Sequence, residues 1–152
     1  MKITFINHQE WGIEPRGFED IIKRFETYLP VQTGDLNVVF VNDVYIQSLN
    51  KAYRGKDQPT DVLSFPYLDA PDFELTRLIG EIYISVETTR RQAEQFGHSF
   101  DFELRKLLVH GVCHVYGYDH IEEEDYIKMH AIECQLLDFD LPFIPRESAE
   151  KL

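Results

Sequence analysis

Three histidines stand close together in the segment His110-Gly-Val-Cys-His-Val-Tyr-Gly-Tyr-Asp-His120. On a helix, residues four apart lie on one face with Cβ atoms about 5–6 Å apart, so His110 and His114 can direct ring nitrogens toward one ion. Gly117 allows the chain to leave the helix, because glycine tolerates positive φ, and His120 then approaches from the following segment. Three imidazoles without a thiolate are typical of zinc with a fourth position open to water, as in a catalytic site.

The spacing H-x3-H-x5-H, with a glycine three residues after the second histidine, equals the ligand spacing of the metzincin proteases. Those enzymes carry a glutamate directly after the first histidine as general base, and here that position is Gly111. A metalloprotease is therefore the weakest alternative, whereas the metal site does not depend on that side chain. Half of the six histidines of the chain fall in this one segment, which favours a metal site over three unrelated side chains.

The composition is that of one globular domain covering residues 1–152. The chain is 43% hydrophobic and long enough to bury about 70% of its unfolded surface in a single core. Neither Cys113 nor Cys134 belongs to a CxxC pair, so we expect packed, reduced thiols, with Cys113 pointing away from the metal. The N-terminus becomes polar too soon for a signal peptide, and no apolar run of about 18 residues occurs. These features predict a soluble cytoplasmic protein without a membrane partner.

The formal net charge of −12 argues against broad binding to nucleic acid such as DNA, because phosphate contacts are made by Lys and Arg. Acidic residues dominate from Glu122 onward, whereas basic residues concentrate earlier. If the basic residues share a face, they offer a positive groove to an anionic substrate; a mixed solvated surface is the alternative. The basic set comprises Lys51, Arg54, Lys56, Arg77, Arg90, Arg91, Arg105 and Lys106.

The elements that position the histidines follow from hydrophobic periodicity. Strands are expected over 2–7, 35–41, 61–65 and 79–85. Helices are expected over 15–30, after an N-cap at Asn42, and over 86–97, 100–116 and 122–138. The 100–116 helix leads into the histidine segment, and its expected core side is Phe102, Leu107, Leu108 and Val109. One α+β domain with the metal site at a C-terminal helix and its following turn is the predicted architecture.

Four segments together resemble the YbeY family: Leu49–Pro66, Gly80-Glu-Ile82, Arg90-Arg-Gln-Ala93 and the histidine segment. These are bacterial, single-domain metal proteins described as endoribonucleases of ribosomal RNA maturation and ribosome quality control. The resemblance spans most of residues 36–138. It implies a mixed sheet, here of about four strands, one zinc ion on the three histidines, and a functional arginine at Arg54. The chain departs from the family pattern at Cys113 and Val115, where Leu is more usual, and at Glu81, where Asp is more usual.

Hydrolysis of a phosphodiester requires a nucleophile and stabilisation of charge on the phosphate oxygens. A three-histidine zinc site lowers the pKa of its water ligand from 15.7 to about 7. Arg54 stays protonated and can hold a phosphate with two parallel hydrogen bonds, although a surface ion pair is the ordinary role of such a residue. Asp119 is expected to orient a ligand imidazole or to cap the turn.

The predicted function is a zinc-dependent endoribonuclease that cuts single-stranded RNA and acts in ribosomal RNA maturation and ribosome quality control. RNA, the ribosome and ribosomal proteins are the expected partners. Water and a ribose 2′-hydroxyl remain alternative nucleophiles. The alternative function is an RNA-binding ribosome-assembly factor whose zinc is structural, and His130 is then the candidate for the fourth ligand that structural zinc requires.

Overall fold

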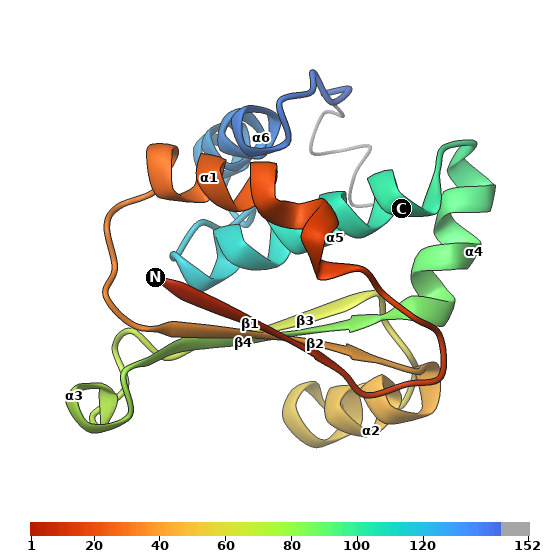
Figure 1. Cartoon of the computed structure of the whole chain (residues 1–152), viewed down its shortest axis with the longest axis horizontal. Helices are drawn as coiled ribbons and strands as arrows, with labels where there is room; N and C mark the ends of the chain where they lie inside the picture. The colour runs from red at the N-terminus through yellow and green to blue at the C-terminus, as the bar shows by residue number, and fades with distance from the viewer. Residues whose placement is uncertain (144–152) are drawn as a thin grey trace.

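A four-stranded sheet forms the centre of the computed structural model, which describes residues 1–143 apart from the side chains of Pro15 and Arg16 (Figure 1). Its spatial order is β1 (Lys2–Asn7), β2 (Asp35–Val41), β4 (Leu78–Ser85) and β3 (Val62–Pro66). The first three strands are parallel, and β3 pairs with β4 in antiparallel fashion. The expected mixed sheet of four strands and the α+β class are confirmed.

Helices cover both faces of the sheet, and one face carries more of them than the other. Helices α1, α5 and α6 lie on one face, α2 lies on the other, and α4 stands at one end (Figure 1). The helix expected from residue 15 begins as a short 3-10 turn, becomes α-helical at Glu19 and ends before Pro30, which lacks the N–H that a helix needs. The bounds are η1 (Pro15–Phe18), α1 (Glu19–Tyr28), α2 (Asp43–Arg54), α3 (Phe73–Thr76), α4 (Val86–Phe96), α5 (Phe100–Val115) and α6 (Glu123–Leu137).

Helix α5 is the central helix of the main core. Its residues Leu107, Leu108 and Val109 are buried as expected, and they pack with Ile82 and Ile84 of β4 in one hydrophobic cluster. The expectation that Phe102 belongs to this core is wrong, because its ring lines a surface groove and is only half-buried. Apolar residues surround most of α5, so its axial position and rotation are fixed by packing on several sides.

The start of α2 is tied to the start of α4 by one carboxylate. Asn42 caps α2 as expected, since its side chain accepts the N–H of Tyr45 at 2.8 Å. Asp43 accepts hydrogen bonds from the hydroxyls of Ser85 and Thr88, each at 2.6 Å, and pairs with Arg91 at 2.7 Å. Burial raises the pKa of Asp43, but these three hydrogen bonds outweigh that effect and hold its pKa below the usual 3.8.

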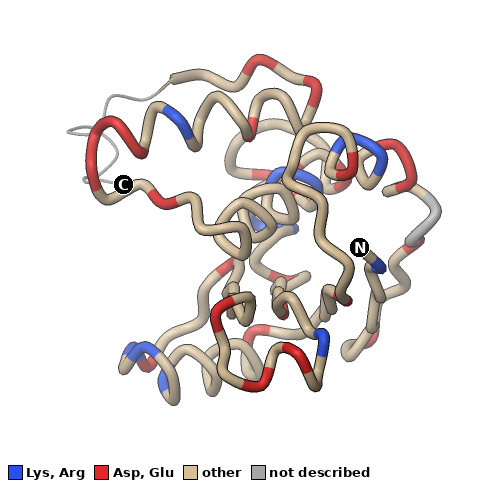
Figure 2. Tube along the Cα trace, turned by 90° about the vertical axis from the view of Figure 1, so that its left-hand side faces the viewer, with Lys and Arg blue, Asp and Glu red and all other residues tan. Residues whose placement is uncertain are grey.

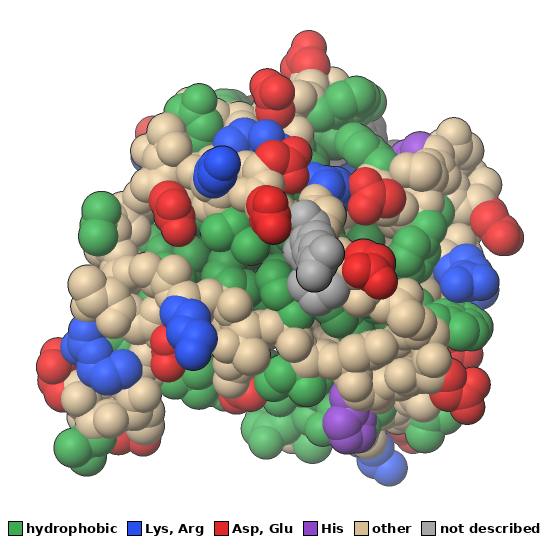
Figure 3. All heavy atoms as spheres, in the orientation of Figure 1, with side chains coloured by type: hydrophobic (Ala, Val, Ile, Leu, Met, Phe, Trp, Pro, Cys, Tyr) green, Lys and Arg blue, Asp and Glu red, His purple; other side chains and the backbone are tan. Residues whose placement is uncertain are grey.

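The basic residues do not gather into a positive groove. Five of the eight pair with carboxylates: Lys51, Arg77, Arg91, Arg105 and Lys106. Figure 2 shows acidic and basic positions distributed along several elements, and the face in Figure 3 carries both charges close together. The mixed surface, which was the alternative expectation, therefore fits these eight residues better than a positive groove does. No helix within residues 1–143 is both long and apolar enough to cross a bilayer.

Candidate metal centre

The three predicted histidines converge at the end of α5. One ring nitrogen from each of His110, His114 and His120 lies within 4.8 Å of the others. The Nε2 atoms of His110 and His114 are 3.1 Å apart, close to the roughly 3.4 Å between two nitrogens that bind one zinc ion tetrahedrally at 2.0–2.1 Å. One nitrogen of each ring therefore converges on a common position that can hold a single metal ion, in agreement with the convergence that the sequence predicted.

Close packing of α5 on the sheet sets the depth of the first two histidines. A Cβ atom at Gly111 would lie 2.8 Å from Ile82 Cγ2 and 3.1 Å from Ser64 Oγ, which is closer than packing tolerates. The Ser64 hydroxyl donates to the Gly111 carbonyl at 3.2 Å. Position 111 thus faces the sheet and not the metal centre, so a protease-type glutamate has no room there, which disfavours the metalloprotease alternative.

The turn after α5 returns His120 to the same site. Gly117 adopts φ +92°, a conformation that side chains with a Cβ rarely take. Asp119 Oδ1 accepts the N–H of Ile121 at 3.2 Å and so caps this turn, which is one of the two roles expected for it.

The electrostatics of the cluster favour neutral imidazoles. Burial, followed by the neighbouring His110 and His120, lowers the pKa of His114 from 6.5 to about 4. Its ring is therefore neutral at pH 7, the form in which histidine binds a metal. Cys113, the residue before His114, is fully buried and free, and burial raises the pKa of its thiol, in agreement with a packing role.

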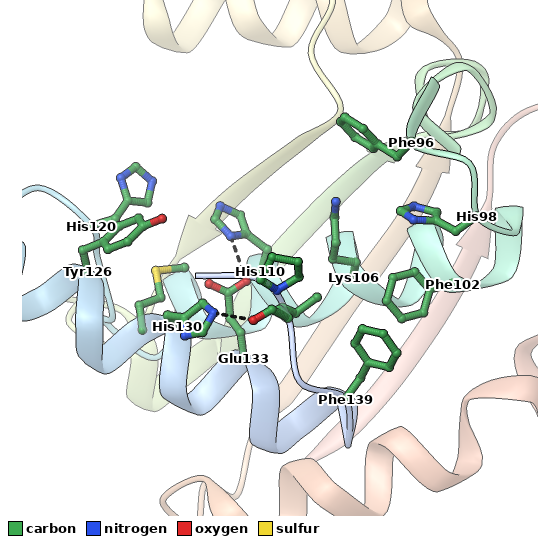
Figure 4. Close-up of a pocket in the computed structure, with 13 residues that line it drawn as sticks. Phe96, His98, Phe102, Lys106, His110, His120, Tyr126, His130, Glu133 and Phe139 are labelled. Carbon is green, nitrogen blue, oxygen red and sulfur yellow. Dashed lines mark hydrogen bonds and ion pairs between the residues drawn. The ribbon is translucent and has the colours of Figure 1, made fainter. Parts of the chain in front are cut away.

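A carboxylate from α6 contacts the first histidine of the cluster. Glu133 Oε2 lies 3.4 Å from His110 Nδ1 (Figure 4). A carboxylate at Nδ1 favours the tautomer that carries its proton there and leaves Nε2 free for a metal. Sequence reasoning missed Glu133, because it lies 23 residues from His110 on a different helix and stands among many other acidic residues without a motif of its own.

His130 does not join the cluster. Its Nε2 lies 3.0 Å from the carbonyl oxygen of Leu141, and it is outside the group of ligand atoms that converge within residues 1–143. Three protein ligands match a catalytic zinc site, whereas structural sites almost always have four. The geometry thus speaks against the structural-zinc alternative.

Arg54 ends α2, on the sheet face opposite α5, and its side chain is exposed (Figure 1). The adjoining Tyr53 ring packs on Phe65 of β3 with centroids 5.1 Å apart, while Ser64 of the same strand bonds to α5 on the other face. Arg54 and the histidines thus flank one edge strand from its two faces. Within residues 1–143 the Arg54 guanidinium forms no hydrogen bond or ion pair, and its role stays a prediction.

The Glu81 side chain lies on the sheet face that α2 partly covers. It accepts hydrogen bonds from the hydroxyls of Tyr67 at 2.9 Å and Tyr83 at 3.1 Å. Burial and the Glu81 carboxylate together raise the pKa of Tyr67 to about 12. In this chain Glu81 therefore organises two tyrosines.

The mixed-sheet α+β fold and the three converging histidines together indicate a class of protein. Three histidine nitrogens are the metal-binding side chains found in metal-dependent hydrolases. The family model described as "Endoribonuclease YbeY" matches residues 6–139. The chain belongs to the YbeY family.

Its relatives and a solved structure agree with this assignment. An Endoribonuclease YbeY of Bacillus cytotoxicus is 44% identical over 110 residues, covering 68% of this chain and 70% of the relative. The Carboxydothermus hydrogenoformans protein of the same name is 46% identical over 106 residues, covering 70% and 72%. A solution structure of TM1509 from Thermotoga maritima superimposes with a TM-score of 0.59 and 26% identity, covering 90% of this chain and 89% of that one.

Proposed function

We propose that this chain is a zinc-dependent endoribonuclease that hydrolyses phosphodiester bonds of single-stranded RNA. The observation that carries the proposal is the convergence of His110, His114 and His120 in a chain of the YbeY family. Bound zinc would supply a Lewis acid and an activated water ligand at neutral pH. Residues 1–152 then act as one metal-dependent hydrolase domain.

The protein side of the reaction is divided among three groups. The histidines hold the ion through nitrogens of which two, both Nε2, already lie 3.1 Å apart, and Glu133 orients His110 from its Nδ1 side. Arg54 is the proposed phosphate ligand, because its guanidinium is exposed and without an ion pair among the described residues. An RNA strand that crosses the edge strand β3 contacts both Arg54 and the histidines.

The biological setting belongs to the same proposal. Relatives are named endoribonucleases, and we propose ribosomal RNA maturation and ribosome quality control as the process, with the ribosome or its proteins as partners in the cytoplasm. The net charge of −12 means that the protein attracts RNA phosphates only weakly. RNA presented by a larger particle such as the ribosome is therefore a more suitable substrate than long free RNA.

The test is cleavage of a labelled single-stranded RNA by zinc-loaded protein, beside His114→Ala and Arg54→Ala purified identically. We expect loss of cleavage in both variants, with RNA binding also weakened in Arg54→Ala. Arg77→Ala is the matched control, since Arg77 already pairs with Glu74 at 3.4 Å and is expected to keep full activity. Equal cleavage in all four proteins would indicate a contaminating nuclease and overturn the proposal; no cleavage in any would favour the assembly-factor function.

A further inference from the structure

A groove of about 750 Å³ opens beside the candidate metal centre. His110 and His120 line both the groove and the metal centre, so the two are continuous (Figure 4). Its walls come from the end of α4, one face of α5, α6 and the segment that follows α6. An ion occupies little of this volume, which lies within the roughly 300–1,000 Å³ of pockets that hold small organic ligands.

Aromatic rings line the end of the groove that lies away from His120. Phe96 and Phe139 stand on opposite sides of it (Figure 4), and they remain 53% and 51% exposed. The ring of Phe102, on α5, packs edge to face on Phe139, with centroids 4.9 Å apart. Large exposed aromatic surfaces gathered in a groove mark a binding site and not a core.

The groove runs along one face of α5. Phe102, Lys106 and His110 are spaced four residues apart, so each step advances about 6 Å along the helix. An aromatic surface therefore begins about 12 Å along the axis from the first metal ligand. An RNA strand bound at the histidines that follows the groove therefore passes over the α5 face that carries Phe102 and Lys106.

The charges at the aromatic end are already matched within the protein. Glu103 is fully buried, and its two oxygens lie 3.2 Å from Lys106 Nζ and 2.6 Å from His98 Nε2. The buried carboxylate offsets the lysine charge, so this end attracts a phosphate only weakly. A neutral, flat and apolar ligand group fits it better.

We propose that the aromatic groove binds, by stacking, a base of an RNA nucleotide that lies along the groove from the scissile phosphate. The inference rests on the proposed function, in which the histidine centre acts on single-stranded RNA. Stacking on aromatic side chains needs no positive charge, so it explains how an acidic protein holds RNA beside its metal. Because every base has a π-face, the groove tolerates either a purine or a pyrimidine.

The test uses zinc-free full-length protein and a fluorescent RNA pentamer, compared with a ribose-phosphate pentamer that has the same charge and no bases. Phe96→Ala with Phe139→Ala removes the two half-exposed rings, and the single variant Phe96→Ala guards against a folding defect. Tyr28→Ala is the matched control, because Tyr28 is 45% exposed on α1. Fluorescence anisotropy gives each Kd, and circular dichroism checks the fold.

We expect the double variant to bind the pentamer about tenfold more weakly than wild type and the control, and to bind the baseless strand no more weakly than wild type does. Equal affinity of wild type and folded variants for the pentamer would overturn the proposal. The groove would then be assigned to the binding of an apolar protein segment. Cleavage by zinc-loaded wild type is measured separately. Stacking without cleavage would overturn the nuclease function alone, and cleavage with unchanged Kd would overturn the stacking alone.

Discussion

Glu133 approaches His110 from the side opposite the metal centre, with 3.4 Å between Glu133 Oε2 and His110 Nδ1. Helix α6 thus contacts the histidine cluster through the second ring nitrogen of His110, while α5 supplies His110 itself. Outer carboxylates of this kind fix the tautomer and the orientation of a ligand histidine. The packing of α6 on α5 is consequently part of the metal site.

Replacing Glu133 with glutamine is expected to weaken zinc binding about 10- to 100-fold, the usual effect of losing such a carboxylate. Competition with a coloured chelator measures the affinity directly, whether or not the protein cleaves RNA. Glu124→Gln on the same helix is the control, since Glu124 is exposed and only pairs with Lys128 at 3.8 Å. An unchanged affinity in Glu133→Gln would show that the contact does not orient the ligand.

Zinc is expected to stabilise the folded protein by mass action, by about 2.7 kcal/mol at a concentration 100 times its Kd. His120→Ala should lose most of this gain, because His120 supplies one of only three converging nitrogens. His130→Ala should keep it, because His130 instead contacts the Leu141 carbonyl oxygen. Thermal unfolding with and without zinc compares the three proteins, and a loss of the gain in His130→Ala would restore the four-ligand structural site.

Replacing Gly111 with valine is expected to destabilise the fold by about 2–3 kcal/mol, as overpacking of a core does. A Cβ atom at this position already approaches Ile82 Cγ2 to 2.8 Å, and the branched side chain adds further contacts. Urea denaturation gives the free energy of unfolding. Gly12→Val is the control, because no atom lies within 4 Å of a Cβ built there, and a similar loss in both variants would contradict the packing argument.

Asp43→Asn is expected to cost about 1 kcal/mol near neutral pH, where the ionised carboxylate accepts its charge-assisted hydrogen bonds. The pKa of Asp43 is lower in the folded protein than its usual 3.8. Its contribution is therefore complete above about pH 4 and is lost as the pH falls through the lower folded value. The stability gap between wild type and variant should shrink in acid.

Urea denaturation of both proteins at several pH values follows that gap. Asp72→Asn serves as the comparison, since Asp72 is exposed and its side chain makes no capping hydrogen bond to α3. A gap of constant size from neutral to strongly acid pH would mean that the ionised form of Asp43 does not stabilise the link between α2 and α4.

Local sequence determined the histidine cluster and most of the secondary structure. The spacing of the three histidines depends on one helix and one glycine turn, both of which are encoded within residues 100–120, so the convergence of His110, His114 and His120 was predicted correctly. Strand and helix bounds followed from periodicity and caps such as Asn42. These features depend on neighbours a few residues away, and such neighbours are visible in a single sequence.

Only the tertiary structure decided which distant residues serve the site. Glu133 reaches His110 because α6 packs on α5, and Phe102 lines a groove whose other wall includes residues of α6. Helices α2 and α5 pack on opposite faces of the sheet, which places Arg54 and the histidines on opposite sides of it. Such relationships depend on the packing of elements far apart in the chain, which periodicity and spacing do not encode.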